Sequence, residues 1–117
     1  MGATSIIAVD SIPERLAIAR QMGADHVVDF TKVDPVPRSC ASPTGAGVDV
    51  AIEALGQQQT FASALRVLRP GGTLSSLGVY SGDLTIPLDA FAAGLGDHTI
   101  VTSLCPAARN GWLGLWM

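Results

Sequence analysis

The chain has 117 residues, of which 48% are hydrophobic and 15% charged, a composition typical of one globular domain rather than of a disordered chain. Its net charge of −3 offers no basic surface to a phosphate backbone, so nucleic acid is a poor partner. Cys40 and Cys105 have no disulfide or zinc-ligand spacing, and with no targeting signal or membrane-spanning stretch visible we expect a cytoplasmic protein.

The first stretch, IIAVDSIPER, predicts a strand followed by a helix. Residues 6–9 form a continuous apolar run, which is typical of a parallel strand covered on both faces. Ser11 and Glu14 have the spacing of a capping box, and Gly23 is expected to end the helix. Because this capping box would satisfy the first amides of the helix, Asp10 is expected to be free to hold a ligand. A helix cap is the alternative role for Asp10.

The rest of the chain continues the alternation of strands and helices. Four more strands are predicted, over residues 26–30, 48–54, 73–79 and 99–104. A second helix is predicted from an apolar face made by Phe61, Ala64, Leu65 and Leu68. The sequence RPGG is expected to break this helix. Strands that alternate with helices predict an α/β fold with a parallel, doubly wound sheet.

Ligands of such a sheet bind beyond the carboxyl ends of its strands. Gly56 and Gly78 stand at such ends, where glycine either admits a flat cofactor or simply makes a turn. Arg15, one turn into the first helix, could face the ligand or the solvent. Glu53 has no identifiable partner, and Asp29 is interpreted as a strand-end acid rather than a catalytic or metal-binding residue.

Two irregular segments and one missing motif stand out. No G-x-G-x-x-G loop precedes Ile6, although a dinucleotide-binding fold uses this loop to bring the pyrophosphate to a helix amino end. Residues 36–47 have no periodicity where a helix would be expected between parallel strands. The tail, residues 106–117, also has no clear period.

Four segments of the chain resemble the coenzyme domain of medium-chain zinc-containing alcohol dehydrogenases, above all their bacterial secondary alcohol dehydrogenase branch. The segments read MGATSIIAVDSIPERLAIARQMGADHVVDF, GVDVAIEALG, TFASALRVLRPGGTLSSLGVYSGDLTIPLD and SLCP. The resemblance implies a partial NAD-binding Rossmann domain over residues 1–105, without its first strand and glycine-rich loop, and a non-homologous tail, residues 106–117. In the family's strand order the missing strand would lie at the centre of the sheet, so two inner edges are expected to be unpaired.

The resemblance also implies a function. Family members are oxidoreductases that transfer hydride between a small alcohol or ketone and a nicotinamide cofactor, and the full-length enzymes are zinc-containing homo-oligomers. This chain has no match to the zinc ligands or the proton-relay residues, so no catalytic or metal-binding residue is assigned. We therefore expect weak or no NAD binding and no dehydrogenase activity from this chain alone.

The implied cofactor contacts lie at the strand ends. Asp10 would bind the adenosine ribose with Arg15 beside it, and an acid at this position favours NAD over NADP, whose 2′-phosphate it repels. The other implied contacts are Ala54, Leu55 and Gly56 along the cofactor, and Leu77, Gly78 and Val79 near the nicotinamide.

The two irregular segments predict a change of reading frame. Relatives typically have EIMRLTDGR and CPGGKERM at these places, and plausible codons for them, read one base out of frame, give the observed PRSCASPTG and PAARNGW. We hypothesise two such shifts in the gene, which resequencing would test.

Two other functions stay open at the level of the sequence. A fragment of an S-adenosylmethionine-dependent methyltransferase would also have an acid after its second strand and the sequence LRPGG. A non-catalytic nucleotide-binding remnant would differ by binding a nucleotide without turnover.

Overall fold

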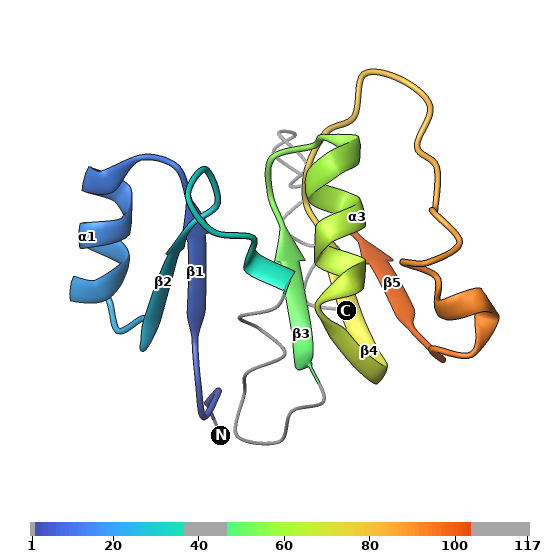
Figure 1. Cartoon of the computed structure of the whole chain (residues 1–117), viewed down its shortest axis with the longest axis horizontal. Coiled ribbons are helices and arrows are strands. Elements are labelled where there is room, and N and C mark those ends of the chain that lie inside the picture. The colour runs from blue at the N-terminus through green and yellow to red at the C-terminus, as the bar shows by residue number, and fades with distance from the viewer. Residues whose placement is uncertain (1, 37–46, 104–117) are drawn as a thin grey trace, which may run out of the picture.

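The computed structural model describes residues 2–36 and 47–103 (Figure 1). Parallel strands alternate with helices, as the sequence predicts. The elements are β1 (Ile7–Asp10), α1 (Pro13–Gln21), β2 (His26–Asp29), β3 (Val48–Glu53), α3 (Gln58–Arg66), β4 (Leu68–Ser76), the 3₁₀ turn η1 (Ala92–Gly94) and β5 (Thr99–Thr102). No helix within these described ranges is long and apolar enough to cross a membrane. The α/β fold class is therefore confirmed. The predicted irregular segment and tail lie almost wholly outside the described residues.

The strands form two parallel sheets rather than one. The first contains β1 and β2, with Ile7 opposite His26 and Asp10 opposite Asp29. The second has the order β3-β4-β5, and both of its pairs are parallel. The two sheets stand side by side with β1 and β3 as their facing edges, and the carboxyl ends of the strands point the same way (Figure 1). Among the described strands, β1 and β3 do not pair, in agreement with the expected inner edges.

Helix α1 begins without the predicted capping box. Ile12 is its N-cap residue and makes no side-chain cap hydrogen bond, while Pro13 opens the helix and Glu14 lies in its first turn. Proline suits this position because its missing amide hydrogen would have no partner there. The helix ends at Gln21, and Gly23 follows with φ 107°, a conformation that glycine adopts readily. The predicted stop is thus confirmed, whereas the predicted cap is wrong.

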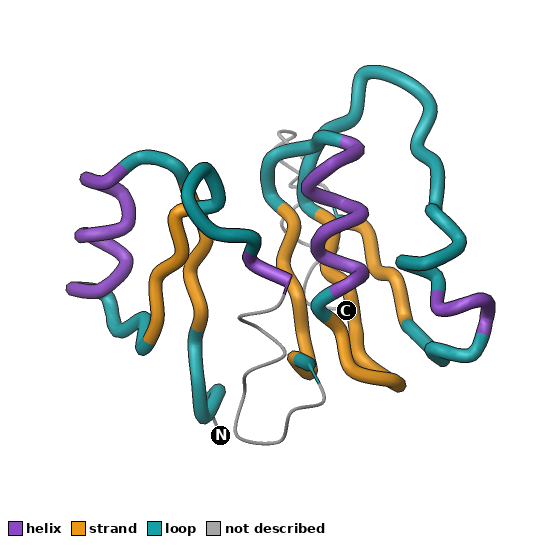
Figure 2. Tube along the Cα trace, viewed as in Figure 1, coloured by secondary structure: helices purple, strands orange, loops and turns teal. Residues whose placement is uncertain are grey.

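Helix α3 packs on β3 and β4, over one face of their sheet (Figure 2). Phe61 and Leu65 of this helix lie in one buried cluster with Leu74 of β4, as the helical spacing predicts. Leu68, however, belongs to β4 and not to the helix, although it joins the same cluster. The apolar period therefore continues across the boundary between two elements, because both bury residues in the same core.

The sequence RPGG lies inside β4 instead of separating it from α3. The strand accommodates it by a register shift, because Val48 pairs with Leu68 but Val50 pairs with Thr73. Gly71, with φ 76°, takes a conformation that other residues rarely adopt. Pro70 cannot donate a ladder hydrogen bond, which is why proline in sheets is confined to edges and irregular places such as this one.

Burial in β3 alternates from residue to residue. Ala51 and Glu53 are buried on the side of α3, whereas Val50 and Ile52 point the other way and Ile52 is 68% exposed. Val9 in β1 is also about half exposed. The prediction that the first strand is covered on both faces is therefore not met by the described residues, although its apolar sequence suits such cover.

Candidate functional site

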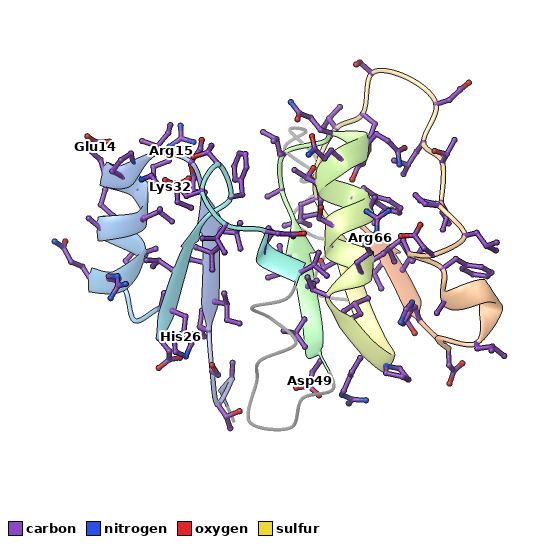
Figure 3. All side chains as sticks on the ribbon, in the orientation of Figure 1. Glu14, Arg15, His26, Lys32, Asp49 and Arg66 are labelled. Atoms are coloured by element: carbon purple, nitrogen blue, oxygen red, sulfur yellow. The ribbon has the colours of Figure 1, made fainter. Side chains whose placement is uncertain are left out.

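The labelled side chains in Figure 3 show which residues lie at the ligand edge of the sheets. Arg15 and Lys32 lie near the carboxyl ends of β1 and β2, where α/β folds bind their ligands. His26 and Asp49 lie at the opposite ends of their strands. The described residues contain no group of three or more histidine, cysteine, aspartate or glutamate side chains able to hold a metal ion.

Asp10 ends β1 and has a structural role that the sequence did not reveal. Its Oδ1 accepts hydrogen bonds from the backbone amides of Ser11, at 2.7 Å, and Ile12, at 3.0 Å. These two amides lie just before α1, so the carboxylate fixes the turn between β1 and α1. The expectation that Asp10 is free of structural duty is thus wrong, because it rested on a capping box that does not form.

The second oxygen of Asp10 remains in reach of a ligand. Its Oδ2 lies 3.6 Å from Nη1 of Arg15, and the Asp10 side chain is 30% exposed. The hydrogen bond from the Ile12 amide, together with that from Ser11 and the positive charge of Arg15, outweighs desolvation and lowers the pKa of Asp10. The group is therefore an oriented carboxylate at neutral pH, and it can accept hydrogen bonds from a ribose diol while its amide contacts persist.

Asp29, at the end of β2, is committed to its own turn. Its Oδ2 lies 2.8 Å from Nζ of Lys32, and its Oδ1 accepts from the amide of Thr31 at 3.0 Å and from the Thr31 hydroxyl at 2.6 Å. The Lys32 contact and the Thr31 hydrogen bonds outweigh desolvation and lower the pKa of Asp29 from 3.8 to about 2. This agrees with its interpretation as a strand-end acid.

Replacing Asp29 with asparagine is expected to lower the free energy of unfolding at neutral pH. A depressed pKa means that the stabilisation is complete above 3.8 and is lost as the pH falls through about 2. The difference between the wild type and Asp29→Asn should therefore be constant near neutrality, shrink as the pH falls below 3.8 and vanish below about pH 2. Urea unfolding at several pH values measures this, with exposed Asp83→Asn as the control for net charge. A difference that persisted unchanged at pH 2 would contradict the assignment.

Glu53 ends β3 and is buried, with only 3% of its surface exposed. Its Oε1 accepts from the amides of Leu55 at 2.9 Å and Gly56 at 2.8 Å, and from the hydroxyl of Thr60 at 2.7 Å. Its Oε2 accepts from the Tyr80 hydroxyl at 2.6 Å. Burial of the carboxyl raises its pKa, but these hydrogen bonds outweigh burial and lower the pKa of Glu53 below its ordinary value. Glu53 is therefore a buried, ionised group.

The turns after β3 and β4 contact each other directly. A Cβ placed on Gly56, whose φ is 84°, would lie 2.8 Å from the backbone nitrogen of Val79. A Cβ on Gly78 would collide with the backbone nitrogen of Gly56 and with Oε2 of Glu53. Such distances are impossible for real side chains, so both glycines are required for this contact. The two glycines are therefore needed so that the turns can touch. The sequence alone suggested only two other roles for them, room for a flat cofactor and a simple turn.

An open pocket adjoins these turns on the α3 side. It is lined by Gly56, Gln57, Gln58, Tyr80, Ser81, Gly82, Asp83 and Leu84. Gln58 also ties the far end of the loop, because its amide group both donates to the carbonyl and accepts from the amide of Thr85, each at 2.8 Å. The loop after β4 is thus held at both ends of this pocket.

The predicted site residues fall into two groups. Asp10 and Arg15 contact each other on the first sheet, while Gly56, Gly78 and Val79 meet at the end of the second. Leu55, Leu77 and Ala54 are exposed at that same end.

The sequence prediction assigned no partner to Glu53, yet this residue joins the two turns of the second group. The sequence holds one signal of this role. Glu53 comes two residues after Ala51 in a strand, so its side chain is expected on the same, buried face, where a carboxylate needs partners.

The comparisons with known proteins agree with this architecture. The family model described as zinc-binding dehydrogenase matches residues 1–116. The chain is 63% identical over 109 residues to an alcohol dehydrogenase of Cupriavidus necator, covering 93% of this chain and 30% of that protein. It is 36% identical over 112 residues to the NADP-dependent isopropanol dehydrogenase of Thermoanaerobacter brockii, covering 92% of this chain and 31% of that protein.

A solved structure gives the same result for the fold. Alcohol dehydrogenase TADH from Thermus sp. ATN1 superposes with a TM-score of 0.79 and 35% identity, over 88% of this chain and 29% of that one. The chain thus spans about a third of the length of the relatives that it matches. These matches favour the dehydrogenase interpretation over the methyltransferase alternative. With a family model matched along almost its whole length and parallel strands arranged as in a solved alcohol dehydrogenase, the chain belongs to the zinc-binding dehydrogenase family.

Proposed function

We propose that this chain forms part of the NAD-binding domain of an alcohol dehydrogenase. NAD supplies the hydride acceptor when it is bound, and the residues of this chain hold and orient it. The chain spans about a third of its relatives' length, so the alcohol pocket and the zinc chemistry would come from protein outside that span. On this proposal the 117 residues alone show weak or no NAD binding and no turnover of any alcohol.

The observation that carries the proposal is the carboxylate of Asp10. It stands at the carboxyl end of a parallel strand, is fixed by two backbone amides and keeps one oxygen near the surface. Ribose hydroxyls are donors that such a carboxylate accepts, and its negative charge disfavours a 2′-phosphate. Arg15 lies beside it and would flank the adenosine ribose.

NADP is the second candidate cofactor, and a specific observation favours it. Three relatives carry NADP dependence in their names, and the exposed guanidinium of Arg15 could pair with a phosphate. We propose NAD nevertheless, because Arg15 is already engaged with Asp10, whose carboxylate would lie next to any 2′-phosphate.

A chimera tests the proposed function in an active context. The aligned segment of this chain replaces the corresponding 109 residues of the Cupriavidus necator relative, and alcohol-dependent reduction of NAD and NADP is measured. We expect turnover with NAD as the preferred cofactor. The 117-residue chain, assayed in parallel, should show none. Turnover by the chain alone, or a folded chimera without turnover, would contradict the proposal.

Replacing Asp10 with serine in the chimera is expected to reduce the preference for NAD over NADP about tenfold or more. The substitution removes a charge-assisted acceptor from the ribose and the repulsion of a 2′-phosphate, and both losses shift the preference toward NADP. The ratio of kcat/KM for the two cofactors measures the change. Asp29→Ser, at the end of the neighbouring strand, is the matched control and should leave the ratio unchanged.

A further inference from the structure

Burial of the Glu53 carboxylate is unfavourable by itself, and its hydrogen-bond donors explain how it stays ionised. An ionised carboxylate costs several kcal/mol to remove from water unless donors surround it. Here Oε1 receives three donors and Oε2 receives the Tyr80 hydroxyl, so both oxygens are satisfied. Among the described residues no buried polar side-chain atom lacks a hydrogen-bond partner. This carboxylate therefore has the partners that burial demands.

Tyr80 extends this network to β4. Its hydroxyl has one proton, which goes to the carboxylate of Glu53, so the Ser76 hydroxyl at 2.8 Å must donate to the Tyr80 oxygen. The ring of Tyr80 packs edge-on against Phe61, with centroids 6.0 Å apart and planes at 87°. Both ends of the Tyr80 side chain are thus fixed, one by the core and the other by Glu53.

The network joins the two turns that carry the predicted cofactor contacts. Glu53 holds the amides of Leu55 and Gly56 in the turn after β3, and through Tyr80 it holds the loop that follows Gly78 and Val79. The apolar side chains of Leu55 and Val79 remain exposed at this edge. Glu53 itself is too buried to touch a ligand. Its contacts fix the backbone on which the exposed residues stand.

We propose that Glu53 and Tyr80 are positioning residues, which hold the Leu55–Gly56 and Gly78–Val79 turns at the spacing that receives the nicotinamide half of the cofactor. The proposal rests on the proposed function. It assigns roles to two residues that the sequence prediction left without any, and it places neither in contact with the cofactor.

The hydrogen-bond directions make a graded series of variants possible. Tyr80→Phe leaves Oε2 of Glu53 without its donor, and Glu53→Leu removes the carboxylate that accepts from two amides and two hydroxyls, although the Thr60 hydroxyl keeps its bond to the Gln57 carbonyl. Glu53→Gln is the conservative variant: its Oε1 can keep the amides and Thr60, and its Nε2 can donate to Tyr80, which then donates to Ser76. Only the first two variants should therefore release the turns.

Hydrogen exchange in the full 117-residue chain tests the structural half of the proposal. In Glu53→Leu, the amides of Leu55 and Gly56 should exchange about tenfold faster or more, because each loses a hydrogen bond to a charged acceptor. Glu53→Gln should stay near the wild type. The amide of Leu74, in the interior of β4, serves as the control for general unfolding. Unchanged exchange of Leu55 and Gly56 would overturn the proposal.

Kinetics of the chimera test the cofactor half. Tyr80→Phe and Glu53→Leu should raise KM for NAD about tenfold, while the inhibition constant of ADP-ribose, which lacks the nicotinamide ring, changes less than about twofold. Glu53→Gln should restore KM to near that of the unsubstituted chimera. Equal losses for NAD and ADP-ribose would reveal a general structural role and overturn the proposal, as would an unchanged KM. Absence of turnover in the unsubstituted chimera would contradict the proposed function itself, and this cofactor role with it.

Discussion

Replacing Gly78 with alanine should destabilise the chain by about 3 kcal/mol or more and abolish cofactor binding in the chimera. The new Cβ would collide with the backbone nitrogen of Gly56 and lie 2.5 Å from its Cα, and it would also press on Oε2 of Glu53. Backbone atoms cannot rotate away as a flexible side chain can. The two turns must therefore separate, and the hydrogen bond between Glu53 and Tyr80 would be lost with them.

Gly82→Ala is the matched control for this effect. A Cβ on Gly82 would meet nothing within 4 Å, although Gly82 lies in the loop that follows the same turn. Urea unfolding of both variants of the chain, and NAD titration of both variants of the chimera, separate the effect of the collision from the effect of the added methyl group. Equal stability of Gly78→Ala and Gly82→Ala would show that the turns do not touch as described.

Replacing Phe61 with alanine should cost about 3–5 kcal/mol of stability, because its ring is only 2% exposed and fills the core between α3 and the β3–β4 pair. The total stability of a small domain is about 5–15 kcal/mol, so this variant should be largely or wholly unfolded. The loss also removes the edge-on contact that supports Tyr80. Circular dichroism during thermal unfolding measures the effect.

Phe91→Ala provides the comparison with an exposed phenylalanine. The Phe91 ring is about half exposed, so its loss should cost far less than that of Phe61. Similar unfolding curves for the two variants would place the core somewhere other than around α3.

The sequence predicted the elements because their patterns are local. The helical spacing of Phe61, Ala64 and Leu65 and the apolar runs of the strands depend on neighbours a few residues away, and each became the expected element. The predicted start of β4 was less accurate, because the strand begins before the sequence RPGG and includes it through a register shift. That adjustment depends on the pairing with β3, which the local sequence does not encode.

The candidate site was only partly predictable for the same reason. Asp10 was recognised as a strand-end acid, but its hold on the Ser11 and Ile12 amides depends on the backbone path into α1, where a capping box had been expected. Glu53 and Tyr80 are 27 residues apart, and nothing in either local sequence announces their contact. The contact follows from the parallel pairing of β3 and β4, which brings the ends of both strands to one edge.

The network around Glu53 also explains why glycines follow both strands. The contact between the turns leaves no room for a Cβ at Gly56 or at Gly78, and Glu53 stabilises the turn after β3 by accepting a hydrogen bond from the Gly56 amide. Residues outside the site thus set its geometry. In this family member the strand ends supply two oriented features, the carboxylate of Asp10 and the joined turns around Glu53.

The most direct measurement of the central claim is the ratio of kcat/KM for NAD and NADP in the chimera with the Cupriavidus necator relative. We expect alcohol-dependent turnover with a preference for NAD that falls when Asp10 is replaced by serine. A folded chimera that has no turnover, or that prefers NADP with Asp10 in place, would show that this chain does not form part of an NAD-binding domain as proposed.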